Sequence, residues 1–344
     1  MEKVRFGKTE LLASRTGFGA IPIQRISEED AISLLRQAYE GGINIYDTAR
    51  AYSDSEIKIG KALSDVRKDI ILSSKTLSRD RDNILKDIET SLKNLQTDYV
   101  DIYQIHNPGF VPKQGDEVYE AFAEIKRQGM IKHIGFTNHS LEHAINAAKS
   151  GLFDTIQYPL SPLSTPEEFG LVALCKELDL GYFAMKALAG GIITNAITSF
   201  VTLRQYENVI PIWGMQTKAE LEEILSFENN PPEMTEEIKA IINKDREELS
   251  GSFCRGCGYC QPCPAEIPIE LAAKITHSIF RMRKENFFTE EWREKMDRIK
   301  NCIHCNHCID HCPYGLDTPS LLAAQLEYYD VLYDRHSKGL PLKG

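Results

Sequence analysis

The stretch VDIYQIH, residues 100–106, is a short apolar run that ends in a histidine. β-Branched and aromatic residues in such a run favour a strand buried on both faces. Seven similar runs occur along the chain, and the ends of successive runs lie about 20 to 31 residues apart, the length of one strand–helix unit. The predicted strands are TGFGA (16–20), INIYD (43–47), IILSSK (70–75), VDIYQIH (100–106), KHIGFT (132–137), DTIQY (154–158), GYFAM (181–185) and NVIPIW (208–213).

The segments between these strands carry helix signals. Ser27 and Asp30 have the spacing of an N-terminal cap, and Thr165 is followed by Pro166, a residue favoured at the first helical position. Eight strand–helix units predict a (β/α)8 TIM barrel. An open doubly wound sheet is the alternative, but it would normally show a GxGxxG turn after its first strand, and the sequence has none there.

The rest of the chain differs from the repeating part. Residues 229–252 are polar and include two prolines, and eight of the nine cysteines lie between positions 254 and 312. We therefore predict an α/β barrel domain over 1–228, a connector over 229–252, a small α-helical, cysteine-rich domain over 253–320, and a C-terminal helix and tail over 321–344.

The composition is that of an ordinary globular protein, with 42% hydrophobic and 26% charged residues among 344. A net charge of −10 argues against nucleic acid or an anionic membrane surface as the main partner. No apolar run approaches the ~20 residues of a spanning helix, and the N-terminal stretch has no secretory apolar core. These features predict a cytoplasmic protein whose clustered cysteines bind metal and do not form disulfides.

Polar side chains stand at the ends of three predicted strands. Asp47, Lys75 and His106 end the second, third and fourth strands, and Tyr52 follows closely in DTARAYSDSE. In a TIM barrel the carboxyl ends of the strands meet at one mouth, where the chemistry takes place. The sequence therefore predicts a catalytic site made of Asp47, Tyr52, Lys75 and His106.

The stretches DTARAYSDSE, ILSSKT, DIYQIHNP and HIGFTNHS, in that order and spacing, resemble the aldo-keto reductases. The resemblance extends over about two thirds of the chain. It implies a (β/α)8 barrel, a nicotinamide cofactor of the NADP type, and reversible conversion of a carbonyl to an alcohol by hydride transfer. It also implies Tyr52 as the acid, supported by Asp47, Lys75 and His106.

These implied roles agree with the chemistry of carbonyl reduction. Hydride addition builds an alkoxide, which needs a proton donor and charge stabilisation. A phenol titrates near ~10, and a nearby ammonium favours the phenolate. Lys75, held by Asp47, is therefore expected to lower the pKa of Tyr52, while His106 hydrogen-bonds the carbonyl oxygen.

The same resemblance implies that Thr137, Asn138 and Gln157 hold the nicotinamide amide. The family commonly stacks an aromatic ring on the nicotinamide from the end of strand seven, where this sequence has Met185 and Lys186. A methionine can pack on a ring, and equally it can belong to the core.

The cofactor diphosphate is expected near the start of the eighth helix, where backbone N–H groups suit an anion, although Thr217 there has the features of a simple helix cap as well. The last strand lacks the family's Lys-Ser…Arg pattern for a 2′-phosphate, and Lys218 is a weak substitute, so NADP and NAD both stay open. The predicted cofactor-binding residues are Gly19, Thr137, Asn138, Gln157, Met185, Lys186, Gly214, Thr217 and Lys218.

Two cysteine runs follow the barrel. CIHCNHCIDHCP (302–313) has the spacing C-x2-C-x2-C-x3-C-P, which binds [4Fe–4S] clusters in bacterial-type ferredoxins, and CRGCGYCQPCP (254–264) is one residue shorter in its last interval. Structural zinc is the alternative, but it usually uses two separated cysteine pairs. The interleaved His304, His307 and His311 are predicted to face solvent, and Cys175, outside both runs, is predicted to be a buried helix residue.

In two-cluster ferredoxins the fourth cysteine of each run binds the other run's cluster. The resemblance of these two cysteine runs to those of two-cluster ferredoxins therefore implies that residues 253–320 form a ferredoxin-like iron–sulfur domain with two [4Fe–4S] clusters and crossed ligands. One set is Cys254, Cys257, Cys260 and Cys312, and the other is Cys302, Cys305, Cys308 and Cys263.

Together these features predict an NAD(P)-dependent, aldo-keto reductase-like oxidoreductase that acts on a small-molecule carbonyl or alcohol. Clusters move single electrons and a nicotinamide moves a hydride, and the sequence shows no signature of the flavin that normally links the two. The clusters either serve a redox partner protein or a hidden cofactor, or they are structural. The alternative function is a redox sensor or electron-relay subunit that binds a nicotinamide nucleotide with little turnover.

Overall fold

The computed structural model describes residues 1–249, 253–281, 284–312 and 314–342. Its chain divides into two compact units. The barrel unit comprises Met1–Ala187 and Ala196–Ile241, and the cysteine unit comprises Leu188–Asn195 and Ile242–Gly344. The boundary near residue 241 falls within one helix, and a loop of the barrel sequence groups with the cysteine unit. The end of the predicted connector (250–252), Pro313 of the second cysteine motif and the end of the tail (343–344) lie outside the described residues.

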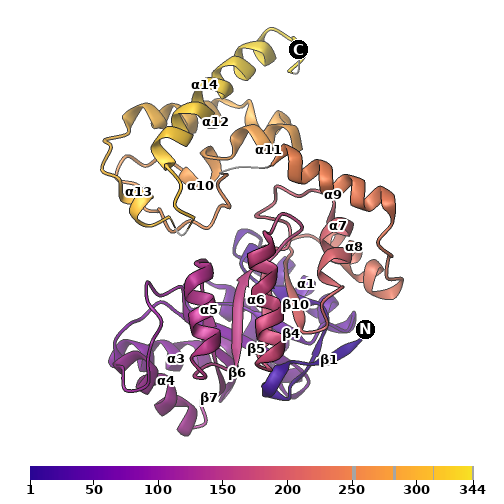
Figure 1. Cartoon of the computed structure of the whole chain (residues 1–344), viewed down its shortest axis with the longest axis vertical. Coiled ribbons are helices and arrows are strands. Elements are labelled where there is room, and N and C mark those ends of the chain that lie inside the picture. Colours follow the sequence, from indigo (N-terminus) through magenta and orange to yellow (C-terminus); the bar gives the residue numbers. More distant parts are fainter. Residues whose placement is uncertain (250–252, 282–283, 313, 343–344) are drawn as a thin grey trace. The chain divides into compact units, whose positions relative to one another are not determined.

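Eight parallel strands close into a barrel in the order β10-β3-β4-β5-β6-β7-β8-β9. Figure 1 labels β4, β5, β6, β7 and β10 among the helices of the barrel unit. This arrangement confirms the predicted (β/α)8 barrel, because every predicted strand is present to within a few residues. The strands are β3 (Gly17–Gly19), β4 (Ile45–Asp47), β5 (Ile71–Thr76), β6 (Val100–His106), β7 (Ile131–Thr137), β8 (Thr155–Pro159), β9 (Gly181–Met185) and β10 (Val209–Gly214).

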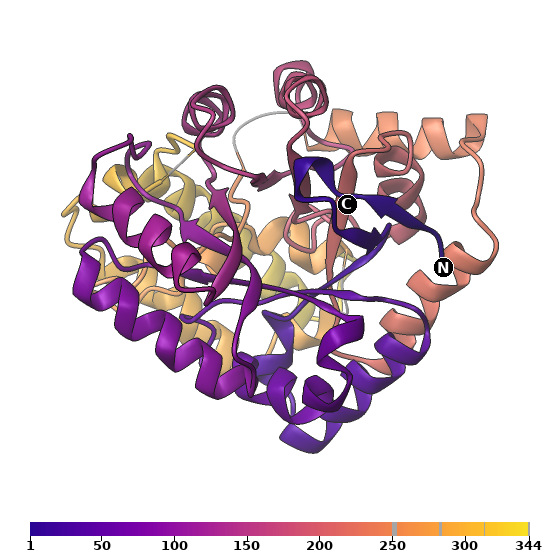
Figure 2. The ribbon, with the colours of Figure 1, turned by 90° about the horizontal axis from the view of Figure 1, so that it is seen from below.

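Helices alternate with these strands and lie outside them (Figure 2). Ser27 caps the first helix by accepting from the Asp30 N–H, and Thr165 forms a capping box with Glu168, as their spacing predicted. On α4, Val118, Ala121, Phe122 and Ile125 are buried with helical spacing. The helices are α1 (Glu28–Glu40), α2 (Ser55–Leu63), α3 (Arg81–Leu95), α4 (Glu117–Arg127), α5 (Leu141–Lys149), α6 (Pro166–Glu177), α7 (Ala196–Leu203) and α8 (Lys218–Asn229).

An N-terminal hairpin that the sequence did not predict precedes the barrel. Strands β1 (Lys3–Arg5) and β2 (Leu12–Ser14) pair antiparallel. Phe6, which lies between them, belongs to a buried apolar cluster with residues from the early parts of several strands. A Cβ on Gly181, the first residue of β9, would lie 2.7 Å from the Phe6 ring, so glycine is needed there. The hairpin therefore packs an aromatic plug against the N-terminal ends of the strands.

The inward face of the barrel changes from apolar to polar along the strands. Successive side chains of a strand alternate between faces, so residues two apart share a face. In β6, Ile102 belongs to the apolar cluster around Phe6, whereas Gln104 hydrogen-bonds side chains of other strands. In β5, Ile71 belongs to that same cluster and Lys75 bonds Asp47. Polar groups thus collect at the carboxyl ends of the strands.

The cysteine unit is helical. A buried core joins its helices and includes Ile275, Ile279, Met296 and Tyr329. Its regular segments are α9 (Glu236–Glu248), which the unit boundary crosses, α10 (Ile269–Ala272), α11 (Ile275–Arg281), α12 (Glu290–Asp297), α13 (His307–Asp310) and α14 (Thr318–Ser337), with 3-10 turns at Lys284–Phe287 and Arg298–Asn301.

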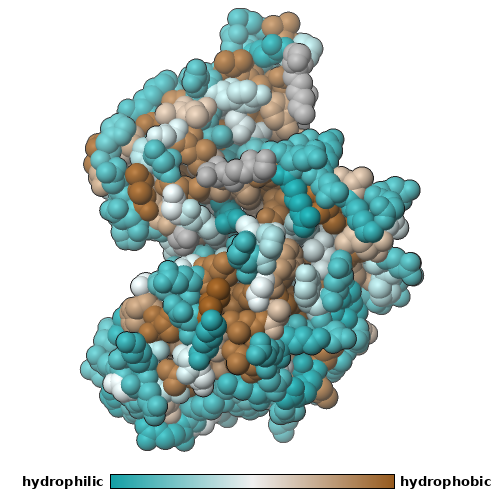
Figure 3. All heavy atoms as spheres, viewed as in Figure 1, coloured by the Kyte–Doolittle hydropathy of each residue, from teal (hydrophilic) through white to brown (hydrophobic). Residues whose placement is uncertain are grey.

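Hydrophilic residues cover much of the molecular face drawn in Figure 3, with hydrophobic residues scattered between them. Within the described ranges, no helix combines the length and the apolar character needed to cross a membrane.

Candidate functional site

A buried ion pair forms the base of the barrel site. Lys75 Nζ donates to Asp47 Oδ2 at 2.6 Å and to the Thr48 carbonyl oxygen at 2.6 Å. Both charged side chains are almost completely buried. Burial lowers the pKa of Lys75, and the Asp47 carboxylate opposes that shift. The pair places a cation at the ends of β4 and β5.

Tyr52 and His106 lie beside this pair. Their ring centroids are 5.9 Å apart in an edge-on arrangement, and Lys75 Nζ lies 5.1 Å from the centre of the Tyr52 ring. The structure therefore brings together Asp47, Tyr52, Lys75 and His106, the four residues predicted to form a catalytic site.

The pKa of Tyr52 differs from expectation. Desolvation by the surrounding protein raises it, and the Asp47 carboxylate adds to the rise. We had expected Lys75 to lower this pKa. The ammonium instead sits against the ring of Tyr52, and its charge is balanced by Asp47 at contact distance. Tyr52 therefore stays a protonated phenol in this arrangement.

His106 is a neutral imidazole. Burial first, then the charges of Lys75 and Arg79, lower its pKa to about 3. Among the described residues, His106 Nδ1 is buried and has no hydrogen-bond partner. Arg79 Nη2 donates to the His106 carbonyl oxygen at 2.6 Å and fixes the end of β6. The imidazole can therefore hydrogen-bond a polar ligand without first losing or gaining a proton.

Gln104 is a site residue that the sequence analysis missed. Its Nε2 lies 2.9 Å from Ser73 Oγ, 2.9 Å from Gln157 Oε1 and 3.2 Å from Asp47 Oδ1. It thereby ties the ion pair to the opposite side of the barrel. Its position two residues before His106 in one strand was the available signal, because both side chains must then share a face.

The cysteines of the second unit line two cavities. Cavity A is lined by Cys254, Cys257, Cys260 and Cys312, and by Arg255 and Tyr314. Cavity B is lined by Cys263, Cys302, Cys305 and Cys308, and mainly by apolar residues otherwise. Cys260 also touches cavity B, and Cys308 also touches cavity A, so the two cavities adjoin.

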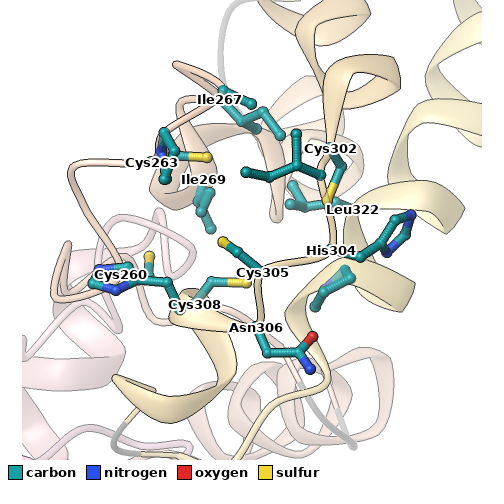
Figure 4. A pocket seen from close by; sticks show the side chains of 15 residues that line it. Cys260, Cys263, Ile267, Ile269, Cys302, His304, Cys305, Asn306, Cys308 and Leu322 are labelled. Atoms are coloured by element: carbon teal, nitrogen blue, oxygen red, sulfur yellow. The ribbon is translucent and has the colours of Figure 1, made fainter.

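In Figure 4 the thiols of Cys263, Cys305 and Cys308 point toward the interior of cavity B, whereas His304 points outward. Among the described residues, no three His, Cys, Asp or Glu side chains gather around a point that could hold one ion. Thiols spread around a cavity wall suit a cluster in which each thiolate binds a different iron. Cys175, by contrast, is fully buried on α6 as predicted, and burial raises its pKa to about 12.

Comparison with known families agrees with both the barrel site and the cysteine-lined cavities. Residues 15–200 match the model of the aldo/keto reductase family. The chain belongs to the aldo/keto reductase family. Residues 253–316 match a 4Fe-4S dicluster domain, which contains all eight clustered cysteines. The chain therefore joins an oxidoreductase barrel to an iron–sulfur domain.

Known members share the barrel. The chain is 31% identical over 222 residues to the aldo-keto reductase YhdN of Bacillus subtilis, a match covering 59% of this chain and 66% of that protein, just under two thirds of its length. It is 28% identical over 232 residues to the NADH-specific methylglyoxal reductase of Escherichia coli, covering 58% and 71%. The fold resembles that of an aldo-keto reductase from Klebsiella pneumoniae in complex with NADPH, with a TM-score of 0.59, 22% identity and coverage of 71% and 94%.

In the barrel, the residues predicted to hold a nicotinamide amide lie at neighbouring strand ends. His106 is paired with Thr137, and Thr137 with Gln157, in the strand register. Gln157 Nε2 donates to Asp47 Oδ2 at 3.0 Å, and Asn138 Nδ2 donates to the Pro108 carbonyl oxygen at 2.8 Å. Each amide keeps a second N–H and further acceptor capacity, so these contacts leave room for a ligand bond.

Close packing alone requires glycine at two of the predicted cofactor-binding positions. A Cβ on Gly19 would lie 2.8 Å from Ile212 Cγ2, and one on Gly214 would lie 3.0 Å from Pro22 Cγ. Met185 ends β9 half-buried, and Lys186 follows it with a positive φ of 57°. The structure thus places these residues at the same end of the barrel, and their cofactor contacts stay predictions.

The start of α8 is capped by side chains of the chain itself. Thr217 forms a capping box with Glu220, as its spacing suggested. Glu220 Oε2 accepts from the N–H groups of Gln216 and Thr217 at 2.8 and 3.0 Å. Lys218 is exposed and lies 3.4 Å from Glu222. A diphosphate at this helix start would therefore meet the negative charge of the Glu220 carboxylate.

Proposed function

We propose that the barrel interconverts a small-molecule carbonyl and its alcohol with a nicotinamide cofactor, and that the cysteine unit holds two [4Fe–4S] clusters. The meeting of Asp47, Tyr52, Lys75 and His106 at the carboxyl ends of the strands carries the first half of this proposal. A phenol, a neutral imidazole and a buried ion pair together supply the groups that carbonyl reduction needs.

The side chains at the barrel mouth suit the reduction of a carbonyl substrate bound beside a nicotinamide. Tyr52 holds a proton on a phenol whose raised pKa keeps it in place until a stronger base, the alkoxide, forms nearby. The neutral imidazole of His106, beside the Tyr52 ring, supports a role for His106 in orienting the carbonyl oxygen. Lys75, paired with Asp47, contacts the face of the Tyr52 ring and holds that ring in place. The bound nicotinamide would supply the hydride, and Thr137, Asn138 and Gln157 would hold its amide.

The choice between NADP and NAD stays open in this proposal. One relative is named for NADH, and one solved neighbour was bound to NADPH. Glu220 at the start of α8 repels phosphate, which weakens any grip on the diphosphate or on a 2′-phosphate placed there. Met185 replaces the aromatic platform that the family commonly uses.

The cavity linings support crossed cluster ligation. Cys312 lines cavity A with Cys254, Cys257 and Cys260, although it belongs to the second run in the sequence. Cys263 lines cavity B with Cys302, Cys305 and Cys308. We therefore assign one cluster to each cavity with these ligand sets. The clusters would exchange electrons with a redox partner protein.

A sensor or electron-relay function is the second candidate. The match of residues 253–316 to a 4Fe-4S dicluster domain supports it, because clusters move single electrons whereas carbonyl reduction needs a hydride.

One experiment distinguishes the two candidates. The full chain is purified without oxygen and analysed for iron, sulfide and bound nucleotide, and NADPH and NADH oxidation is then measured with a panel of aldehydes, ketones and dicarbonyls. Rapid steady-state oxidation with one panel member supports the reductase. Tight nucleotide binding without turnover supports the sensor, and zinc without iron would contradict the cluster assignment.

A further inference from the structure

The side chain of Gln104 on β6 reaches past a neighbouring strand of the barrel. In the strand register Gln104 is paired with Gly135 on β7, and Gly135 is paired with Thr155 on β8. A Cβ on Gly135 would lie 2.8 Å from Gln104 Cγ and 2.6 Å from Thr155 Oγ1. Because Gly135 has no side chain, Gln104 can contact β8, where its Nε2 donates to Gln157 Oε1 at 2.9 Å.

Both N–H groups of the Gln104 amide are used inside the barrel. One serves Gln157 Oε1, and the other lies between Ser73 Oγ at 2.9 Å and Asp47 Oδ1 at 3.2 Å. The Ser73 hydroxyl in turn donates to Asp47 Oδ1 at 2.9 Å. Among the described residues, Gln104 Oε1 is buried and has no hydrogen-bond partner, which destabilises a fold. The amide therefore contributes through its two donors.

The amide of Gln157 is held at both of its polar atoms. Its Oε1 accepts from Gln104, and its Nε2 donates to Asp47 Oδ2 at 3.0 Å. A carboxylate only accepts hydrogen bonds, so Asp47 determines that the nitrogen of Gln157 faces the ion pair. One hydrogen bond would leave the amide free to turn about it, and the bond from Gln104 removes that freedom by holding the oxygen. Gln104 therefore fixes the plane of the Gln157 amide.

The fixed plane matters because of the bonds that the Gln157 amide can still make. Its nitrogen can donate once more and its oxygen can accept once more. Gln157 is buried, so bulk water competes little for these two bonds. A ligand amide has the complementary groups, an acceptor oxygen and a donor nitrogen, and can use both capacities of Gln157. A ketone in the same place can only accept, so it leaves the oxygen of Gln157 unused.

We infer that Gln104 is a positioning residue for cofactor recognition, because it holds the Gln157 amide in the plane in which Gln157 selects the carboxamide of a nicotinamide nucleotide. Gln104 acts through Gln157 and donates only to protein atoms. It also connects the ion pair of Asp47 and Lys75 with the cofactor-binding residues on the other side of the barrel. This inference rests on the proposed nicotinamide site.

The test compares two nucleotides that differ only in one group on the pyridine ring. NADP+ carries a carboxamide there, and its 3-acetylpyridine analogue carries a methyl ketone, which has no N–H to donate. Each is titrated calorimetrically into the anaerobically purified full chain, with NAD+ and its analogue as a second pair. Because the rest of the nucleotide is identical within a pair, changes elsewhere cancel in the ratio of the two Kd values. The unmodified chain should bind the carboxamide nucleotide about tenfold more tightly than the analogue, equivalent to about 1.4 kcal/mol.

Gln104→Met removes the amide and keeps an unbranched side chain of similar length. The Kd ratio should fall from about tenfold to about threefold, because the oxygen of Gln157 is no longer held. Gln104→Asn keeps an amide but withdraws it by one methylene group, and it should show the same loss. Gln128→Met makes the same chemical change at the exposed end of α4 and should keep the full ratio. A purely structural role for Gln104 would weaken both nucleotides equally and leave the ratio unchanged.

A Kd ratio in Gln104→Met equal to that in Gln128→Met would overturn the inference. Urea unfolding shows whether each variant keeps its fold. Equal affinity of the unmodified chain for both members of a pair would also overturn the inference, even if neither Gln104 variant folds. A chain that binds none of the four nucleotides would contradict the proposed nicotinamide site itself, whereas binding without discrimination would contradict only this inference.

Discussion

Lys75 Nζ lies 2.6 Å from Asp47 Oδ2 inside the barrel, and neither side chain reaches solvent to any useful extent. Breaking a buried pair leaves one charge without compensation, which typically costs about 3–5 kcal/mol. Lys75→Met should therefore lower the free energy of unfolding by about 3 kcal/mol or more. The double variant Asp47→Asn, Lys75→Met should recover part of that loss, because no unpaired charge remains.

Urea unfolding followed by tryptophan fluorescence measures this effect. The chain has two tryptophans, of which Trp213 is buried in β10 and Trp292 lies in the cysteine unit. In a Trp292→Phe background the fluorescence reports on the barrel alone. Additive losses in the double variant would show that the pair contributes nothing as a pair.

Tyr52→Phe removes the phenolic proton and keeps the ring against His106 and Lys75. Carbonyl reduction should fall by about 10² or more, while nucleotide affinity changes little. Steady-state rates and a nucleotide titration check both statements. Tyr39→Phe, which removes a hydroxyl near Asp69 on the outer surface, is the matched control. Near-normal turnover in Tyr52→Phe would exclude Tyr52 as the acid.

The barrel could be predicted from the sequence because its strands are short, apolar and evenly spaced, and because Asp47, Lys75 and His106 end three of them. Gln104 could not be assigned its role, since that role depends on which strands close the barrel and bring Gln157 across from it. The N-terminal hairpin escaped prediction because its three-residue strands carry too few residues to show a period.

The direction of the Tyr52 pKa shift also could not be predicted from the sequence. The sequence placed Lys75 near Tyr52 but could not show that the ammonium faces the ring and is neutralised by Asp47, which reverses the expected shift of the Tyr52 pKa.

The neutral state of His106 predicts an acid-sensitive barrel. The pKa of His106 is about 3 in the folded chain and ordinarily near 6.5, so above pH 6.5 both states are neutral. As the pH falls below 6.5, only the unfolded chain takes up this proton. The free energy of unfolding should therefore drop by up to about 1.4 kcal/mol per pH unit from 6.5 toward 3.

Urea unfolding at several pH values, again with Trp213 as reporter, measures this slope. In His106→Asn the free energy of unfolding should fall less steeply below pH 6.5, by about 1.4 kcal/mol per pH unit, because one fewer proton is taken up on unfolding. His143→Asn, on the outer helix α5, is the control and should keep the full slope. An unchanged slope in His106→Asn would contradict the prediction.

Glu220 should restrain nucleotide binding, because its carboxylate occupies the N–H groups of Gln216 and Thr217. Glu220→Ala removes a negative charge and frees both donors, so NADPH should bind about tenfold more tightly, equivalent to about 1.4 kcal/mol. Loss of the capping box should cost the helix about 1 kcal/mol. Glu222→Ala removes the same charge without touching these donors and is the control. Equal tightening in both variants would point to long-range charge alone, and no change would place the diphosphate elsewhere.

The crossed ligand sets give the last prediction. Cys312 lines cavity A and Cys263 lines cavity B. Each therefore lines the cavity that is also lined by the first three cysteines of the other sequence run. If clusters form with these ligands, Cys312→Ala removes one thiolate from the cluster bound by Cys254, Cys257 and Cys260. The cluster of Cys302, Cys305 and Cys308 keeps all four ligands.

Cys263→Ala should have the opposite effect, which makes the two variants controls for each other. Cysteines of one run are labelled selectively, and their paramagnetically shifted resonances are followed after anaerobic reconstitution. Cys312→Ala should disturb the resonances of Cys254, Cys257 and Cys260 and spare those of its own run. Disturbance confined to Cys302, Cys305 and Cys308 would instead demonstrate local ligation, and the fourth thiolate of each cavity would then have to come from the run that supplies the first three.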